Sequence, residues 1–285
     1  MAAMGGPVAV VTDSTAYLPG GLAERFGVSV VPLQVVLGGR TGAEGSEITP
    51  TDVASALSRW VPVGTSRPTP ADFADVYRAA LEGGAGGVVS LHLSRELSGT
   101  WDSARVAADE VDPVAIRVVD SRSAAMGLGF AVLAAAEAAA DGAGLEEAYQ
   151  AAVSTAERTT TLFYVDTLEH LRRGGRIGAA QALLGTALSV KPILHVREGR
   201  IVPLEKVRTA SKGVSRLEAL AVAAAGDGPA DVAVHHLAAP DRARTLADRL
   251  RTRLPNLRRL VESEVGAVVG AHVGPGVLGV VVVRG

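Results

Sequence analysis

The sequence contains no cysteine, which excludes disulfide bonds, thiolate nucleophiles and cysteine-ligated metal sites. This absence suits a reducing compartment, and we expect the protein to be cytoplasmic. Aromatic residues make up only 4% of the chain, and 28 Lys and Arg against 30 Asp and Glu leave a formal net charge of −2. Proteins that bind nucleic acid usually present a basic surface and often stacking aromatic side chains. The sequence therefore predicts no nucleic-acid partner.

The sequence also lacks a convincing membrane span. Residues 265–283 contain no Asp, Glu, Lys or Arg and would be long enough to cross a bilayer. However, Gly274-Pro275-Gly276 would break a helix through this segment, and His272 lies within it. We therefore expect a short helix, a turn and a buried strand here, in a soluble protein without stable membrane insertion.

Hydrophobic residues make up 48% of the chain, which is enough for a sizeable core. Short β-branched runs alternate with alanine-rich helical patterns, as in parallel sheets joined by crossover helices. The sequence predicts an α/β fold with two α/β domains, residues 1–158 and 159–285, each with a largely parallel sheet. Expected strands are 8–12, 28–37, 87–93, 114–119, 162–165, 190–196, 201–207, 231–235 and 278–283. Expected helices are 71–81, 100–109, 124–140, 145–158, 211–225 and 241–254.

Small polar residues gather where predicted strands end, which is where ligands bind in open α/β sheets. Ser98-Gly99-Thr100 opens a predicted helix, and Ser98 either caps that helix or contacts an anionic ligand. Arg176 follows two glycines and is either a solvated surface residue or a bidentate clamp for a carboxylate. His272 is either a core histidine with satisfied hydrogen bonds or a residue that faces a ligand. Further clusters are Thr12-Asp13-Ser14-Thr15, Thr65-Ser66 and Asp120-Ser121-Arg122-Ser123.

Common motifs for nucleotide binding, metal binding and serine hydrolysis are absent from the sequence. It has no Walker A sequence, no H-E-x-x-H and no G-x-S-x-G. His235 and His236 are adjacent, but neighbouring residues on a strand point to opposite faces and cannot easily chelate one ion. We therefore expect no metal and no cofactor.

Several segments, taken in order along the chain, resemble the DegV family. The matches run from residue 8 to residue 280, so the resemblance covers the whole chain. The segments are Val11-Thr12-Asp13-Ser14-Thr15-Ala16, Thr65-Ser66-Arg67-Pro68-Thr69-Pro70, Leu93-Ser94-Arg95-Glu96-Leu97-Ser98-Gly99-Thr100-Trp101, Val119-Asp120-Ser121, Leu168-Glu169-His170-Leu171-Arg172-Arg173-Gly174-Gly175-Arg176-Ile177, Val190-Lys191-Pro192-Ile193-Leu194, Lys206-Val207-Arg208-Thr209 and His272-Val273-Gly274-Pro275-Gly276.

This resemblance implies a long-chain fatty acid, such as palmitate, held in a tunnel between two α/β domains. It implies a lipid-binding carrier that is not itself an enzyme, the acyl-carrying subunit of a fatty acid kinase. The partner would be a separate ATP-binding kinase subunit related to dihydroxyacetone kinases, and its acyl-phosphate product would feed phospholipid synthesis. By motif position, the fatty acid carboxylate would be bound by Thr65, Ser98, Arg176 and His272, with Ser66, Gly99 and Thr100 as neighbouring contacts.

Four residues depart from the family pattern around these positions. Arg95 and Glu96 replace small or polar residues, Trp101 stands where tyrosine is usual, and Val273 replaces threonine beside His272. These departures concern the pocket mouth and the preference for acyl chain length, whereas the expected carboxylate ligands are intact.

The alternative function is a serine hydrolase acting on a lipid or acyl ester. Ser98 would be the nucleophile, His272 the base, and Asp13 or Asp120 the carboxylate that orients the base. The residue types suffice for such a triad, but their spacing does not establish one.

Overall fold

The computed structural model describes residues 6–183 and 191–285, and the chain forms two compact units. The first unit comprises Met1–Leu33 with Arg67–Glu157, and the second comprises Gln34–Ser66 with Arg158–Gly285. The expected division into 1–158 and 159–285 differs from these units because residues 34–66 belong with the second half of the chain. The reason is packing, since α2 (Pro50–Ser58) and the sheet formed by residues 34–66 lie against α10 (Ala267–Val273).

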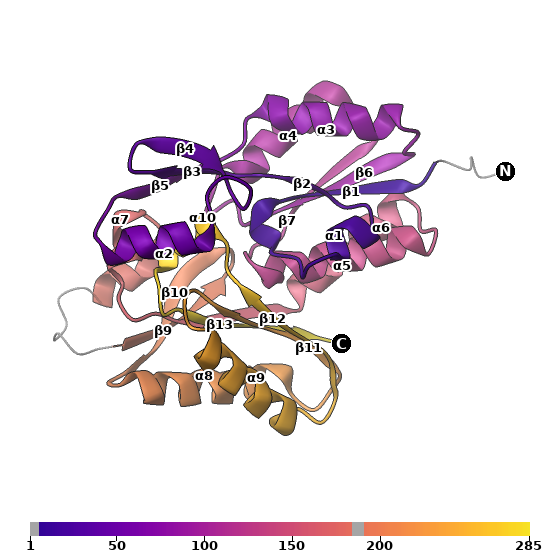
Figure 1. Ribbon diagram of the computed structural model, residues 1–285. Helices are drawn as coiled ribbons and strands as arrows, with labels where there is room; N and C mark the ends of the chain where they lie inside the picture. Colours follow the sequence, from indigo (N-terminus) through magenta and orange to yellow (C-terminus); the bar gives the residue numbers. More distant parts are fainter. Residues whose placement is uncertain (1–5, 184–190) are drawn as a thin grey trace. The chain divides into compact units, whose positions relative to one another are not determined.

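The first unit contains a parallel sheet, as the sequence predicts, and helices cover both of its faces. Its strand order is β2-β1-β6-β7, and all three strand pairs are parallel. Figure 1 shows α3 and α4 on one side of this sheet and α5 and α6 on the other. The strands are β1 (Val8–Asp13), β2 (Ser29–Val31), β6 (Gly87–His92) and β7 (Ile116–Asp120). The helices are α1 (Leu22–Arg25), α3 (Pro70–Glu82), α4 (Thr100–Val111), α5 (Met126–Ala140) and α6 (Leu145–Glu157), with a 3₁₀ turn at Ser14–Ala16.

Local sequence signals set the start of α3. Thr69 is the N-cap, its side chain accepts a hydrogen bond from the Asp72 backbone, and the Asp72 carboxylate accepts one from the Thr69 backbone. Pro70 occupies the first helical turn, where its missing N–H costs nothing. The helix thus begins at Pro70, one residue before the expected start at residue 71.

A chain of buried polar side chains crosses the core of the first unit. Asp13 Oδ2 lies 3.1 Å from His92 Nδ1, and His92 Nε2 lies 2.8 Å from Ser90 Oγ. Tyr77 donates its hydroxyl to Ser90 Oγ at 2.8 Å. All four side chains are completely buried, so their mutual hydrogen bonds compensate for lost hydration. This chain ties the carboxyl ends of β1 and β6 to helix α3.

The six-stranded sheet of the second unit is mixed, and the expectation of a largely parallel sheet there is wrong. Its order is β10-β9-β8-β13-β11-β12, and only β11 and β12 pair in parallel. A tight hairpin joins β9 to β10 through Glu198 and Gly199, whose φ values of 51° and 78° match a type I′ turn. The strands are β8 (Thr159–Tyr164), β9 (Lys191–Arg197), β10 (Arg200–Val207), β11 (Ala230–His236), β12 (Leu257–Glu264) and β13 (Leu278–Arg284).

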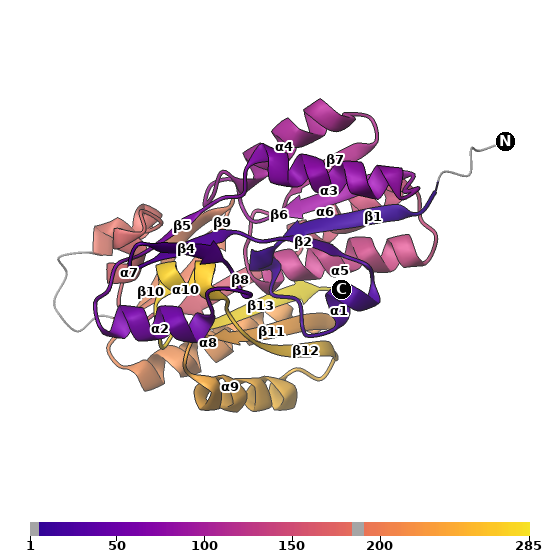
Figure 2. The ribbon, with the colours of Figure 1, turned by 45° about the horizontal axis from the view of Figure 1, so that its top comes forward.

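Two helices cover one face of this sheet, as Figure 2 shows for α8 (Ala210–Ala225) and α9 (Pro240–Arg253). Leu217 of α8 and Leu246 of α9 are fully buried in its core. The segment after β12 folds as α10, a turn and the buried strand β13, which confirms the prediction for residues 265–283. The predicted strand 190–196 corresponds to β9, but Val190 lies outside the described residues.

A smaller antiparallel sheet completes the second unit, in the order β4-β3-β5. The predicted strand 28–37 is in fact two strands that belong to different units, β2 and β3 (Gln34–Leu37). Pro32 separates them, and proline has no N–H to donate to a strand ladder. The remaining elements are β4 (Arg40–Ala43), β5 (Val63–Ser66), α7 (Glu169–Arg173) and a 3₁₀ segment at Gly178–Leu183.

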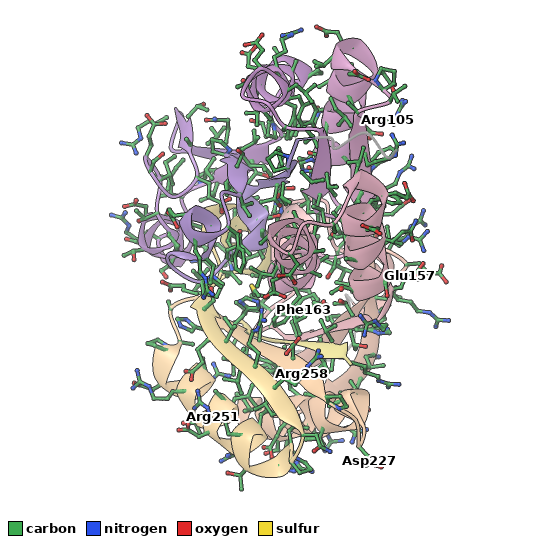
Figure 3. All side chains as sticks on the ribbon, turned by 90° about the vertical axis from the view of Figure 1, so that its right-hand side faces the viewer. Arg105, Glu157, Phe163, Asp227, Arg251 and Arg258 are labelled. Atoms are coloured by element: carbon green, nitrogen blue, oxygen red, sulfur yellow. The ribbon has the colours of Figure 1, made fainter. Side chains whose placement is uncertain are left out.

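The outer helices carry paired charges. Arg105 projects from the surface of α4 in Figure 3 and lies 2.9 Å from Asp109. Arg251 of α9, also labelled there, contacts Asp248 at 2.7 Å and Glu262 at 3.0 Å. Within the described ranges, no helix is both long and apolar enough to span a membrane.

Candidate functional site

The Ser98 loop lies between β6 and α4 in the first unit. Ser98 Oγ is 2.9 Å from Thr100 Oγ1 and accepts a hydrogen bond from the Thr100 backbone N–H at 3.3 Å. The N-cap of α4 is Gly99, which makes no side-chain capping bond, so Ser98 is not the cap itself. Thr100 is buried and Ser98 is half-buried. The loop therefore presents a coupled pair of hydroxyls at the start of a helix.

In the second unit, the fold brings Thr65 and His272 together although they are 207 positions apart. Thr65 Oγ1, on β5, lies 2.9 Å from Nε2 of His272, on α10. The other ring nitrogen, Nδ1, is buried and has no hydrogen-bond partner among the residues that the structure describes. A buried polar atom without a partner is costly, and this ring nitrogen is packed against Gly174.

Arg176 shares this environment. Its Nη1 donates to the carbonyl oxygen of Gly174 at 2.7 Å, which fixes the guanidinium on the backbone of the preceding turn. Burial lowers the pKa of His272 to about 4, and the positive charge of Arg176 contributes in the same direction. At neutral pH the site thus contains one fixed cation, Arg176, beside a neutral imidazole.

The approach of the His272 ring explains the glycine at position 174. A Cβ added to Gly174 would overlap His272 Nδ1. The backbone φ of Gly174 is −75°, which any residue adopts, so the requirement for glycine is spatial and not conformational. Gly174 therefore lets the ring and the Arg176 turn lie in direct contact.

The titration of His272 leads to a prediction about stability. Its folded-state pKa of about 4 lies below the ordinary value of 6.5, so the unfolded chain binds more protons between these values. Stability contributed by the neutral ring is fully present above pH 6.5 and is lost as the pH falls toward 4. We expect His272 to contribute about 1 kcal/mol per pH unit to the loss of unfolding free energy in this window.

Urea denaturation of the wild type and of His272→Gln across that window measures this contribution. The variant should show a shallower loss of stability. His235→Gln serves as the comparison variant. Burial also lowers the pKa of His235 to about 4, but this residue lies on β11 and pairs with β13, away from β5. Equal pH slopes for the wild type and His272→Gln would contradict the prediction.

A second polar cluster supports the loop that follows α10, and the sequence interpretation missed it. Asp166 Oδ1 accepts from the Tyr164 hydroxyl at 2.6 Å and lies 3.2 Å from Lys191 Nζ. Arg242 Nη1 donates to the carbonyl oxygen of Gly276 at 3.3 Å and lies 3.8 Å from Asp166 Oδ2. Burial and the neighbouring carboxylate raise the pKa of Tyr164. Lys191 lies in a segment that carries the family resemblance, and this was the one signal in the sequence that could have pointed to the cluster.

The other predicted residues have simpler positions. Ser66 is exposed at the end of β5, where its backbone pairs with Gln34. The α carbon of Gly99 is packed against the guanidinium of Arg67, since a Cβ there would overlap Arg67 Nη1. Thr100 contacts Ser98 as described above. These observations place Gly99 and Thr100 beside Ser98, whereas Ser66 points to the surface of its own unit.

The described geometry gives no support to a hydrolytic triad. Asp13 hydrogen-bonds to His92 in the core, and Asp120 Oδ1 accepts from the backbone N–H of Arg122 at 2.8 Å. His272 Nδ1, which a triad carboxylate would orient, has no such partner in the described part of the chain. Within the same residues, no group of three or more His, Cys, Asp or Glu side chains is arranged to hold a metal ion.

Known proteins match this sequence and this fold over nearly the whole chain. A DegV domain-containing protein of Streptomyces coelicolor is 62% identical over 96% of this chain and 98% of its own length. The solved structure of a DegV family protein from Thermus thermophilus, described as fatty acid binding, shares 38% identity with this chain and has a TM-score of 0.92 over 97% of this chain and 99% of its own. DegV from Bacillus subtilis, described as a fatty acid binding protein, shares 35% identity with a TM-score of 0.88 over 98% and 99%.

A family model also matches nearly the whole chain. The model of the uncharacterised DegV family COG1307 matches residues 7–285. Together with the fold and with the relatives above, this match shows that the chain belongs to the DegV family.

Proposed function

We propose that this protein binds a long-chain fatty acid and that Thr65, Ser98, Arg176 and His272 bind its carboxylate. The observation that carries this proposal is the hydrogen bond between Thr65 and the neutral His272 ring, with the charge of Arg176 beside them. When Nε2 of the neutral ring donates to Thr65, the Thr65 hydroxyl is left to donate to the ligand, so that two hydroxyls, of Thr65 and Ser98, and the guanidinium of Arg176 can meet the acceptor oxygens of a carboxylate. The relatives from Thermus thermophilus and Bacillus subtilis are described as fatty acid binding.

The energetics favour a long apolar ligand with a polar end. Burial of one methylene contributes about 0.8 kcal/mol, so roughly 15 methylenes supply about 12 kcal/mol before the cost of association. Burial of an unpaired carboxylate would offset much of this gain. Hydrogen bonds and an arginine partner reduce that loss, because they replace the water that the carboxylate gives up.

We further propose that the chain acts as a carrier and presents the carboxyl group to a separate kinase, which binds ATP. In that scheme the kinase transfers the phosphoryl group and forms the acyl phosphate, while this chain holds and orients the acyl group. The charge arrangement supports retention of a free carboxylate, since an arginine that pairs with the carboxylate stabilises the bound acid.

Denaturing extraction of the purified protein, followed by mass spectrometry of the released lipid, tests the binding proposal. A stoichiometric fatty acid is the expected result and identifies the preferred chain. An empty extract from a protein that also fails to bind added palmitate would overturn the proposal.

The carrier role has its own assay. Palmitate-loaded protein, ATP and a DegV-dependent fatty acid kinase subunit should form an acyl phosphate that hydroxylamine traps as a hydroxamate. The chain without the kinase subunit should form none. Reaction of Ser98 with a fluorophosphonate probe would instead support an esterase and contradict the carrier role.

Replacement of Ser98 by alanine is expected to weaken palmitate binding about tenfold without unfolding the protein. The change removes a hydroxyl that we assign to the carboxylate, and a hydrogen bond to a charged group contributes about 1.5–3 kcal/mol. Isothermal titration with palmitate measures the loss. Ser211→Ala, at an exposed position of α8, is the matched control and should bind as the wild type does. Unchanged affinity in a folded Ser98→Ala variant would remove Ser98 from the site.

A further inference from the structure

The Ser98 loop is fastened at its base by residues from both neighbouring strands. β6 lies between β1 and β7, and the loop begins where β6 ends. Three consecutive backbone N–H groups of the loop are held, namely Leu93 N–H by Asp13 Oδ2 at 3.0 Å, Ser94 N–H by the carbonyl oxygen of Ser123 at 2.8 Å, and Arg95 N–H by Asp120 Oδ1 at 3.3 Å. All of these residues belong to the first unit. The loop therefore leaves the sheet between two fixed points, one on each side.

The fastened segment continues directly to Ser98. The backbone N–H of Ser98 donates to the carbonyl oxygen of Ser94 at 3.1 Å. The Ser94 side chain is completely buried, and its hydroxyl accepts from the backbone N–H of Glu96 at 3.2 Å. Because this turn is short and hydrogen-bonded, a shift at the base of the loop would move Ser98 as well.

Asp13 is held rigidly in the core. Its Oδ1 accepts from the backbone N–H of Thr15 at 3.0 Å and from the Thr15 hydroxyl at 2.5 Å. Its Oδ2 accepts from Leu93 and lies 3.1 Å from His92 Nδ1. The Asp13 side chain is completely buried, where a carboxylate is stable only if its oxygens are hydrogen-bonded. Asp13 therefore cannot rotate away from Leu93 without losing several of these bonds.

The proton count along the buried polar chain agrees with this arrangement. Tyr77 donates its hydroxyl to Ser90 Oγ, which leaves the Ser90 hydroxyl to donate to His92 Nε2. The ring proton of His92 then lies on Nδ1 and points to Asp13 Oδ2. Each side chain thus donates to the next, and the chain ends on the carboxylate that holds Leu93.

We propose that Asp13 and Asp120 are positioning residues for Ser98, which fix the base of the Ser98 loop from both sides and so set where the Ser98 hydroxyl meets the ligand. This inference rests on the proposed function, since it assumes that Ser98 binds the carboxylate. It gives a role to two polar clusters that the carboxylate ligands leave unused, residues 12–15 and 120–123.

Asp120 offers the first test, because it is only partly buried and lies at the edge of the core. Asp120→Ala should weaken palmitate binding about fivefold by isothermal titration. Asp120→Asn keeps the oxygen that accepts from the backbone and should restore most of the affinity. Asp112→Ala is the matched control, since Asp112 Oδ1 also accepts two backbone N–H groups, of Val114 and Ala115, but at the opposite end of β7. This control should bind palmitate as the wild type does.

A double-mutant cycle with Ser98→Ala separates positioning from a general loss of stability. If Asp120 acts through the Ser98 hydroxyl, Asp120→Ala should weaken palmitate binding by less than about twofold once that hydroxyl is absent. Asp13→Ala removes the buried anchor and should weaken binding about tenfold in the presence of Ser98, with the same dependence on the hydroxyl. The Asp120 cycle decides the question if the Asp13→Ala protein does not fold.

Two outcomes would overturn the inference while the fatty acid proposal stands. One is normal palmitate binding by Asp120→Ala, and the other is an equal fold-loss with and without the Ser98 hydroxyl. Failure of the wild type to bind palmitate would overturn both the inference and the proposed function.

Discussion

Arg176→Ala is expected to weaken palmitate binding about 100-fold, the largest loss of affinity among the proposed ligands. Removal of the guanidinium leaves the bound carboxylate without its cation, and an unpaired buried charge costs about 3–5 kcal/mol. The figure of 100-fold corresponds to the lower end of that range, because Arg176 is only half-buried. The loss should appear mainly in the dissociation rate, since steering toward the site is only a small part of the effect. Isothermal titration and stopped-flow displacement of palmitate measure the two quantities.

Two variants separate the causes of that loss. Arg176→Lys retains the charge and should recover part of the affinity, although it cannot reproduce the planar geometry of the guanidinium. Arg251→Ala removes a surface arginine of α9 and should bind normally. Normal palmitate binding by a folded Arg176→Ala protein would show that Arg176 does not bind the carboxylate. The cation that pairs with the carboxylate would then have to be another residue.

Gly274→Ala is expected to have the largest effect on stability, about 3–5 kcal/mol. Gly274 has φ 79° and ψ 168°, a backbone region that is essentially restricted to glycine. A Cβ there would also overlap the imidazole of His170. The substitution therefore combines backbone strain with a steric overlap on α7. Urea denaturation followed by circular dichroism measures the loss of unfolding free energy.

The second unit offers a matched control for the backbone component. Gly226 follows α8 with φ 65° and ψ −156°, and a Cβ added there meets no atom within 4 Å. Gly226→Ala should therefore show strain alone, about 1–3 kcal/mol. The difference between the two variants isolates the overlap with His170. Equal destabilisation by both substitutions would show that the overlap is relieved at no cost.

The Gly274 prediction also bears on ligand binding. Gly274 follows directly after α10, the helix that carries His272, and Gly276 is held by Arg242 through its carbonyl oxygen. A shift of this loop would move His272 relative to Thr65. We therefore expect the Gly274→Ala protein to lose palmitate affinity as well, whereas Gly226→Ala should retain it.

Much of the local structure follows from the sequence because its causes are local. The capping box of Thr69 and Asp72 involves residues three positions apart, so it is visible without a fold. The break at Gly274-Pro275-Gly276 was equally clear, and it correctly separated α10 from β13. The division of residues 28–37 into two strands had a local signal too, Pro32, which the interpretation as one strand overlooked.

The sequence could indicate which residues belong to the candidate site, but not which of them contact one another. The family resemblance singled out Thr65 and His272, and the fold places Thr65 Oγ1 2.9 Å from His272 Nε2. Nothing in the spacing of the two residues indicates that contact. The role of Asp13 was left open by the sequence. In the structure its carboxylate is hydrogen-bonded to His92 in the core. The assignment of these residues to a fatty acid carboxylate stays a prediction.

By itself, the sequence determined the absence of cysteine chemistry, several starts and breaks of its helices, the α/β alternation and the family to which it belongs. These properties depend on composition, on residues a few positions apart, or on motifs in series. Only the tertiary structure decided that residues 34–66 join the second unit, that β13 runs antiparallel between β8 and β11, and that Gly174 must be small to admit the His272 ring. Strand direction and close approach depend on packing between distant parts of the chain, and strand-forming residues carry little information about their partners.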